Sequence, residues 1–171
     1  MADGGADQMR SVSPDEDSRA YRDALGRFAT GVTVVTCQSE LGALGITANS
    51  FASVSLDPPL VLWSPARASR RFPAFATADR FAIHVLGEEE EPLCRRFSAD
   101  GTDFDGLDWS RGVGETPLIE GCLARFECET VARHDGGDHL IVVARVARAS
   151  WRPGRPLVFH GGQYGRFTNS G

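Results

Sequence analysis

Short runs of alternating apolar and polar residues, separated by turn-forming residues, make up most of the chain after residue 31. The clearest alternation runs from Gly121 to Val131, where apolar and charged side chains take opposite faces, as in a half-exposed strand. Further strands are expected at residues 32–37, 44–48, 51–56, 60–64, 81–86, 140–149 and 156–160. Many short strands with few helices predict a mainly β, antiparallel barrel or sandwich.

An amphipathic helix is predicted near the start of the chain. Tyr21, Leu25 and Phe28 are spaced i, i+4 and i+7, which puts them on one helical face. We expect this helix to begin near Ser18 and to end at Gly31.

Other segments are less regular. Residues 68–78 predict a short helix interrupted by Pro73, and the acidic run 88–91 suits the N-terminal end of a third helix. Residues 99–117 predict a long loop. The first half of the strand at 140–149 is apolar on both faces, so we expect both faces to be buried.

The chain length of 171 residues fits one domain with a substantial core. Residues 1–16 are acidic and small and predict a disordered tail, which leaves residues 17–168 as the single domain. No apolar run reaches the ~18 residues of a membrane helix. The first 17 residues do not resemble a secretory signal, so we expect a cytoplasmic location.

Charge and residue usage exclude several classes of function. A net charge of −5 without a basic tract argues against nucleic-acid binding. All 18 basic residues are arginine, so neither a Schiff-base enzyme nor a P-loop can be built, and arginine, hydroxyls or amides must hold any phosphate. The four cysteines lack zinc spacing, so we expect no metal site. No G-x-G-x-x-G string occurs, which argues against a Rossmann nucleotide site.

Residues 45–60 are rich in hydroxyl and amide side chains between apolar residues. Such a bend suits a flat polar heterocycle, whose ring edge needs several donors and acceptors beside an apolar face. A turn whose Ser and Thr side chains only cap their own backbone explains the composition equally well. Composition alone leaves both interpretations open.

This segment, together with residues 26–36 and the Gly137-Asp138-His139 sequence, resembles the short flavin reductases. These are the reductase components of two-component flavin monooxygenases, and the resemblance covers about Tyr21 to Phe167. It implies an antiparallel split β-barrel that binds flavin at a homodimer interface. It also implies that NADH or NADPH reduces FAD or FMN, and that a separate oxygenase receives the reduced flavin.

The resemblance assigns flavin contacts along the polar segment and beyond it. The isoalloxazine edge would meet Gly45, Ile46, Thr47, Ala48, Asn49 and Ser50. The ribityl chain and phosphate would meet Ser53, Ser55, Ser64, Ser69 and Arg70. Phe97 matches a common aromatic position of the family. A solvated helix position for Arg70 and core packing for Phe97 are the alternatives.

The resemblance also implies a nicotinamide side, on which His139 is the catalytic candidate. Asp138, Tyr164, Arg27 and Thr30 would complete it. From spacing alone, an isolated histidine is more often structural than functional.

Two departures from the family leave questions open. His84 stands where many relatives have asparagine, so flavin affinity or cofactor preference can differ. The stretch Arg67–Arg71 lacks the lysine of some relatives, which leaves FMN against FAD open. A flavin-storage or electron-transfer protein of the same fold is the main alternative function. A barrel oxidase with its own substrate, such as a pyridoxamine phosphate oxidase, is disfavoured because the motifs of that group are missing.

Overall fold

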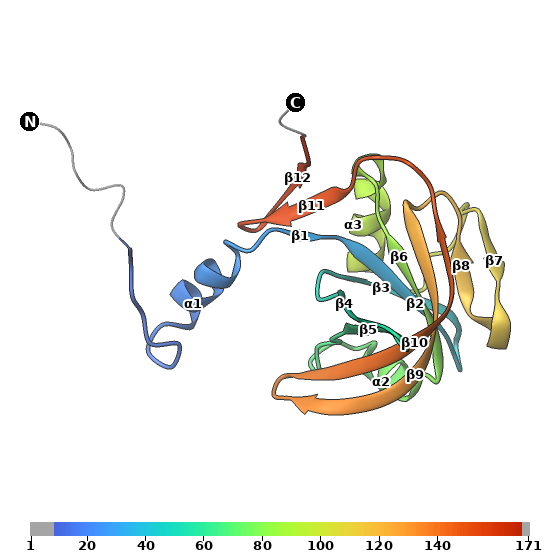
Figure 1. Ribbon diagram of the computed structural model, residues 1–171, viewed down its shortest axis with the longest axis horizontal. Helices are drawn as coiled ribbons and strands as arrows, with labels where there is room; N and C mark the ends of the chain where they lie inside the picture. Colours follow the sequence, from blue (N-terminus) through green and yellow to red (C-terminus); the bar gives the residue numbers. More distant parts are fainter. Residues whose placement is uncertain (1–8, 169–171) are drawn as a thin grey trace, which may run out of the picture.

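The computed structural model describes residues 9–168 and is built mainly from antiparallel strands (Figure 1). The largest sheet has the order β3 (Gly42–Ala48), β2 (Thr33–Ser39), β6 (Arg80–Val85), β9 (Ala124–Gly136), β10 (His139–Trp151), β5 (Pro59–Trp63) and β4 (Ala52–Leu56). A three-stranded sheet contains β1 (Thr30–Gly31), β11 (Leu157–His160) and β12 (Gln163–Arg166), and a two-stranded sheet contains β7 (Trp109–Arg111) and β8 (Pro117–Ile119). The helices are α1 (Ser18–Leu25), α2 (Phe72–Thr77) and α3 (Glu91–Ala99), with 3₁₀ turns η1 (Glu88–Glu90) and η2 (Val113–Glu115).

The large sheet is curled because its two edge strands are joined by a very short connection. β3 and β4 lie at opposite ends of the strand order, yet only residues 49–51 separate them. Four Cα–Cα steps span at most about 14 Å, so the two edges have to approach each other. The side chain of Ser50 fixes this connection to the end of β5: its hydroxyl accepts from the Ser64 amide at 2.9 Å and donates to the Ser64 carbonyl at 3.2 Å.

β2 is buried on both faces and separates two hydrophobic clusters. Val35 packs with Trp63, Phe75 and Phe81 in the cluster under α2. Val34, its neighbour, points the other way and packs in the cluster that contains Phe97 of α3, together with Leu86, Ile119 and Leu157. The strand period of two residues produces this division. β2 is therefore the centre of the core.

His84 of β6 is fully buried and connects three strands. Its Nε2 accepts a hydrogen bond from the Ile119 amide at 3.0 Å, so the neutral ring carries its proton on Nδ1 and donates it to the Val34 carbonyl, also at 3.0 Å. Burial lowers the pKa of His84 from its ordinary value of 6.5 to about 4. Because both ring nitrogens have backbone partners, neither is left to bind a cofactor directly.

The predicted fold class and most strands are confirmed, but the first helix is shorter than expected. α1 ends at Leu25 with Gly26 as its C-cap, and Thr30 and Gly31 instead form β1 against β11. The amphipathic pattern extends to Phe28. However, α1 buries none of its own residues, so no packing carries the helix that far.

Four further expectations need correction. Pro73 stands in the first turn of α2, where a missing amide costs nothing, and so starts the helix instead of interrupting it. The expected loop 99–117 contains β7 and η2. β11, the strand expected at 156–160, pairs with β1 and β12 in the three-stranded sheet and not with the large sheet, and β12 is a further strand that the pattern did not predict. The first half of β10 is buried on one face only in the single chain, because Val142 and Ala144 are covered whereas Ile141 and Val143 are half-exposed.

Residues 1–8 of the predicted disordered tail lie outside the described residues, and residues 9–16 are exposed with a turn at 14–16. The limits of the predicted domain, 17–168, remain a prediction. Among the described helices, none has both the length and the apolar character that crossing a membrane requires.

The buried His84 predicts that stability depends on pH. Its pKa is lower in the folded chain, so on acidification the unfolded chain takes up the proton first, and stability falls between pH 6.5 and 4. The linkage amounts to about 2 kcal/mol between pH 7.5 and pH 5. Urea unfolding at both pH values should therefore show a smaller loss for His84→Asn than for the parental protein.

His160→Asn, at an exposed position, is the matched control and should keep the parental pH dependence. An identical pH dependence in His84→Asn and the parental protein would contradict the assignment.

Candidate functional site

A groove of about 430 Å³ lies between the N-terminal segment around α1, the β3–β4 connection and the β11–β12 turn. Arg27, Phe28 and Thr30 line it from one side, and Asn49 and Phe159 line it from the body of the protein. Its volume lies within the range of small-molecule sites. Figure 1 shows α1 standing away from the sheets, next to β1 and the turn between β11 and β12.

The polar groups of this groove suit a planar, partly charged ligand. Thr30 Oγ1 is buried without a hydrogen-bond partner among the described residues, and such a hydroxyl needs an acceptor or donor from elsewhere. Gly161 and Gly162 have positive φ angles of 57° and 81°, and a Cβ at either would meet nothing within 4 Å. A ring can therefore approach the backbone closely here. Arg22 and Arg27 add positive charge, with Asp23 beside them.

Two of the polar side chains in the 45–60 segment, Thr47 and Ser50, make hydrogen bonds within the protein. Thr47 Oγ1 donates to the Cys94 carbonyl of α3 at 2.7 Å, and Ser50 bonds the backbone of Ser64 as described above. Both hydroxyls have structural roles, but they bond backbone groups 47 and 14 residues away along the chain and are not the local caps of the capped-turn interpretation. Asn49 is exposed and lines the groove, while Ser53 is exposed on β4. The turn therefore combines structural hydroxyls with polar groups that are free to bind.

Gly45 and Phe97 pack directly on each other. A Cβ on Gly45 would lie 2.5 Å from Cδ1 of Phe97, so only glycine fits. The Phe97 ring is fully buried and lies 4.9 Å from that of Phe104. The geometry favours core packing for Phe97, since its buried ring packs against Gly45 of β3. Ile46 and Ala48 of the same strand are half-buried and pack against the cluster under α2.

The loop after β5 contains two adjacent arginines with different surroundings. Arg71 donates to the Phe97 carbonyl at 2.6 Å and to the Ser98 carbonyl at 3.3 Å, and so caps the C-terminal end of α3. Arg70 is exposed, and Ser69 accepts a hydrogen bond from the Arg71 amide. Arg70 is thus the arginine of this pair that is available for a phosphate. No pattern in the sequence indicated the structural role of Arg71.

His139 begins β10 at the tip of the β9–β10 hairpin. Its Nδ1 lies 2.7 Å from Oδ1 of Asp138, and this hydrogen bond holds the pKa of Asp138 below its ordinary value. An isolated backbone bridge pairs His139 with Ala66. The structure therefore brings His139 and Asp138 next to the loop of Ser64, Ser69 and Arg70.

The other residues predicted for the nicotinamide side lie elsewhere in the single chain. Arg27 and Thr30 line the groove at α1 and β1, whereas Tyr164 of β12 packs against α3. The Arg95 guanidinium lies 5.3 Å from the Tyr164 ring, and a hydrogen bond with Cys94 raises the pKa of the phenol. In Figure 1 the β9–β10 tip lies below β3 and β4, whereas β1 lies above them and α1 to their left. These residues flank the predicted flavin segment from two sides and do not form one cluster.

Sequence reasoning missed several lining residues of the groove, namely Arg22, Asp23, Leu25, Gly26, Phe28, Phe159, Gly161 and Gly162. The Gly161-Gly162 pair was the one available signal, because consecutive glycines often mark a close approach of backbone to a ligand.

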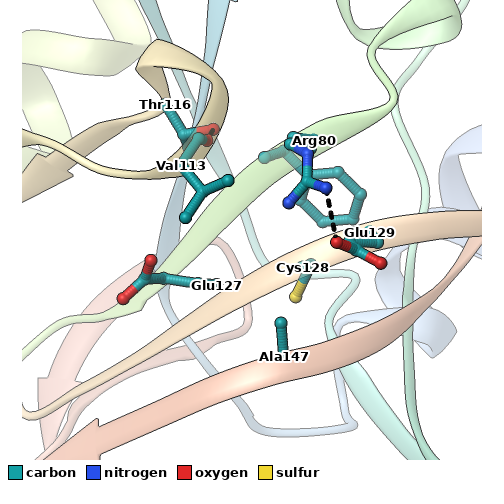
Figure 2. Close-up of a pocket in the computed structure, with 8 residues that line it drawn as sticks. Arg80, Val113, Thr116, Glu127, Cys128, Glu129 and Ala147 are labelled. Atoms are coloured by element: carbon teal, nitrogen blue, oxygen red, sulfur yellow. Dashed lines mark hydrogen bonds and ion pairs between the residues drawn. The ribbon is translucent and has the colours of Figure 1, made fainter.

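A second, much smaller cavity lies between β6, β9 and η2 (Figure 2). Arg80 and Glu129 form an ion pair of 2.7 Å at its side, with Glu127, Cys128 and Val113 around it. Its volume of about 30 Å³ suits a water molecule and excludes a flavin.

The cysteines do not offer a nucleophile. Burial raises the pKa of Cys37, Cys122 and Cys128 to about 12, so their thiols stay protonated at neutral pH. All four cysteines are free, and Cys94 is also buried. Core packing accounts for them.

The chain is similar to known proteins over most of its length. Residues 25–168 match the family described as flavin reductase like domain. The chain is 57% identical over 157 residues to FMN reductase (NADH) SmoA of Agrobacterium fabrum, which covers 92% of this chain and 90% of that protein. It is 41% identical over 150 residues to HsaB of Rhodococcus jostii, the reductase subunit of a flavin-dependent monooxygenase, covering 86% of this chain and 77% of HsaB.

Among solved structures, the NADH:FAD oxidoreductase SgcE6 of Streptomyces globisporus superimposes with a TM-score of 0.88 at 36% identity. The superposition covers 96% of this chain and all of the other, and it confirms the predicted flavin-reductase fold. The chain belongs to the flavin reductase-like domain family.

Proposed function

We propose that this flavin reductase uses NADH to reduce an exchangeable FMN or FAD and that it releases the reduced flavin to a separate monooxygenase. The observation that carries the proposal is the groove beside Asn49, with its unpartnered Thr30 hydroxyl and open glycine backbone. The names of the relatives support the reaction, since they describe NADH-dependent reductases and reductase subunits of flavin-dependent monooxygenases.

The bound nicotinamide and flavin supply the redox chemistry, in which hydride passes from nicotinamide C4 to flavin N5. The protein's own residues position the two rings and exclude competing reactions. Asn49 would hold the ring edge with its amide, and Arg70 would pair with the phosphate. His139, kept in orientation by Asp138, would contact the nicotinamide side. Thr30 and Arg27 would bind the remaining polar groups of the nucleotide.

Both flavins remain within the proposal. SmoA is named for FMN, and SgcE6 is named for FAD. NADH is favoured because both of these proteins, and a reductase from Rhodococcus sp that is 39% identical over 158 residues, are named for NADH. A cytoplasmic location fits the four free cysteines, which suit a reducing compartment.

A homodimer is the second part of the proposal. Apolar side chains on one face of β10 and β5 are half-exposed in the single chain, namely Ile141, Val143 and Leu62, which is the register partner of Val143. Apolar side chains gathered on an uncovered face mark an interaction site. A second copy of the chain would cover it, and two-fold dimers are the commonest closed assembly.

The reaction predicts that NADH is oxidised only when free flavin is added, and that the reduced flavin leaves the protein. The groove is lined partly by exposed residues, among them Arg22, Arg27 and Asn49, so a flavin can enter and leave it from the surface. Anaerobic reduction followed by ultrafiltration should recover reduced flavin in the filtrate. Flavin that stays with the protein through many turnovers would favour the storage or electron-transfer alternative.

The dimer predicts a specific effect of charge on this face of β10 and β5. Val143→Asp would put a carboxylate into the interface, so light scattering at micromolar concentration should give a dimer for the parental protein and a monomer for the variant. Val113→Asp, on the exposed η2 turn, is the matched control and should remain dimeric. A parental protein that binds flavin as a monomer would exclude the dimer.

The two sides of the site predict separable effects. Asn49→Ala should weaken flavin binding by about 1–3 kcal/mol, because a buried hydrogen bond is lost. His139→Ala should leave flavin affinity nearly unchanged and slow flavin reduction by up to ~100-fold, since hydride transfer depends steeply on placement. Flavin fluorescence titration and single-turnover reduction measure the two effects. If His139→Ala reduced flavin at the parental rate, the histidine would have no role in the reaction.

A further inference from the structure

Arg67 ties the hairpin tip that carries His139 to the loop that follows β5. Its backbone amide donates to the Asp138 carbonyl at 2.9 Å. Its side chain donates from Nε to the Gly137 carbonyl at 3.0 Å and from Nη2 to Oδ1 of Asp135 at 2.6 Å. Arg67 therefore contacts three residues of the turn that precedes His139, namely Asp135, Gly137 and Asp138.

Neighbouring backbone contacts extend this connection on both sides of Arg67. Ala66 forms a bridge with His139, and the Leu140 amide donates to the Pro65 carbonyl at 3.1 Å. The guanidinium also lies 5.5 Å from the centre of the Phe72 ring, at the first residue of α2. The planar guanidinium is thus fixed from both the hairpin and the helix.

Besides the strand pairing and these backbone contacts, the Arg67 side chain gives the turn a further support. Gly137 has a φ of 72°, and residues 135–138 at the tip are exposed. The His139–Asp138 contact orients the ring only relative to its own chain neighbour. An exposed ion pair by itself stabilises little, but two side-chain donors in a fixed geometry restrict where the turn can lie.

We propose that Arg67 is a positioning residue that sets the place of His139 relative to the loop of Ser64, Ser69 and Arg70. The inference rests on the proposed function, in which this loop holds flavin and His139 faces the nicotinamide. Arg67 touches neither ligand in this assignment and acts through the Gly137 and Asp135 contacts. The same link makes the flavin loop and the nicotinamide residue move together.

The test combines Arg67→Met with His139→Ala in a double-mutant cycle. Methionine keeps an unbranched apolar stem beside Phe72 and removes both side-chain donors. At saturating NADH, Arg67→Met should slow single-turnover flavin reduction about tenfold, as a displaced ring predicts. In the His139→Ala background the same change should cost less than about twofold, because residues that act through one another are non-additive. Flavin dissociation constants should stay within about twofold throughout.

Hydrogen exchange gives a readout that does not depend on activity. In Arg67→Met the amides of residues 67 and 140 should exchange faster, because they donate across the loosened junction. Arg133→Met is the matched control. Like Arg67, Arg133 links the hairpin to another segment, because its side chain donates to the Ala78 carbonyl at 2.8 Å. Its side chain is 33% exposed, compared with 42% for Arg67, and it lies away from the tip. It should change neither the reduction rate nor these two amides.

Three outcomes would overturn the inference. The first is a rate of flavin reduction in Arg67→Met equal to that of the parental protein. The second is a tenfold slowing by Arg67→Met that persists in the His139→Ala background. The third is a slowing in Arg133→Met as large as that in Arg67→Met. A failure of the proposed function would look different, because the parental protein itself would then oxidise no NADH with added flavin. The exchange measurement would still report whether Arg67 holds the tip.

Discussion

The three-residue connection between β3 and β4 is the constraint on which the rest of the structure depends. It joins the two edges of a seven-stranded sheet, so the sheet can form only when it is curled. β9 and β10 make this possible, since β9 pairs with β6 and β10 with β5, and the two halves of the sheet meet only through them. The Ser50–Ser64 hydrogen bonds then fix the connection to the end of β5.

This closure explains why polar side chains gather where they do. The connection has to cross between edges without strand pairing, so its backbone and side chains are left to bond one another or a ligand. Ser50 serves the first purpose, while Asn49 faces the groove. A site built on such a junction is rigid without being buried, which suits a flavin that enters and leaves during each turnover.

Local patterns predicted much of this architecture, and the failures share a physical cause. The alternation from Gly121 to Val131 correctly predicted a strand, which the structure places at Ala124–Gly136, because the pattern of strand burial is a local property. Which strands pair is not local: a short connection usually joins neighbours, and here it joins opposite edges. His84 shows the same limit for the site. Its hydrogen-bond partners, Val34 and Ile119, are distant in the chain. The sequence therefore suggested that the histidine, found where many relatives have asparagine, bears on the cofactor, whereas in the structure it connects strands in the core.

The edge position of β4 has a consequence for the handling of the protein. An edge strand exposes a row of unpaired backbone groups, and such a row can pair with a strand of another molecule and start aggregation. β4 is only five residues long, and after Asp57 it is followed by Pro58 and by Pro59, the first residue of β5. Prolines lack the amide that continued pairing requires, so they limit the length over which an intermolecular sheet can grow. Lengthening this segment, or replacing the prolines, would therefore make aggregation easier without stabilising the fold.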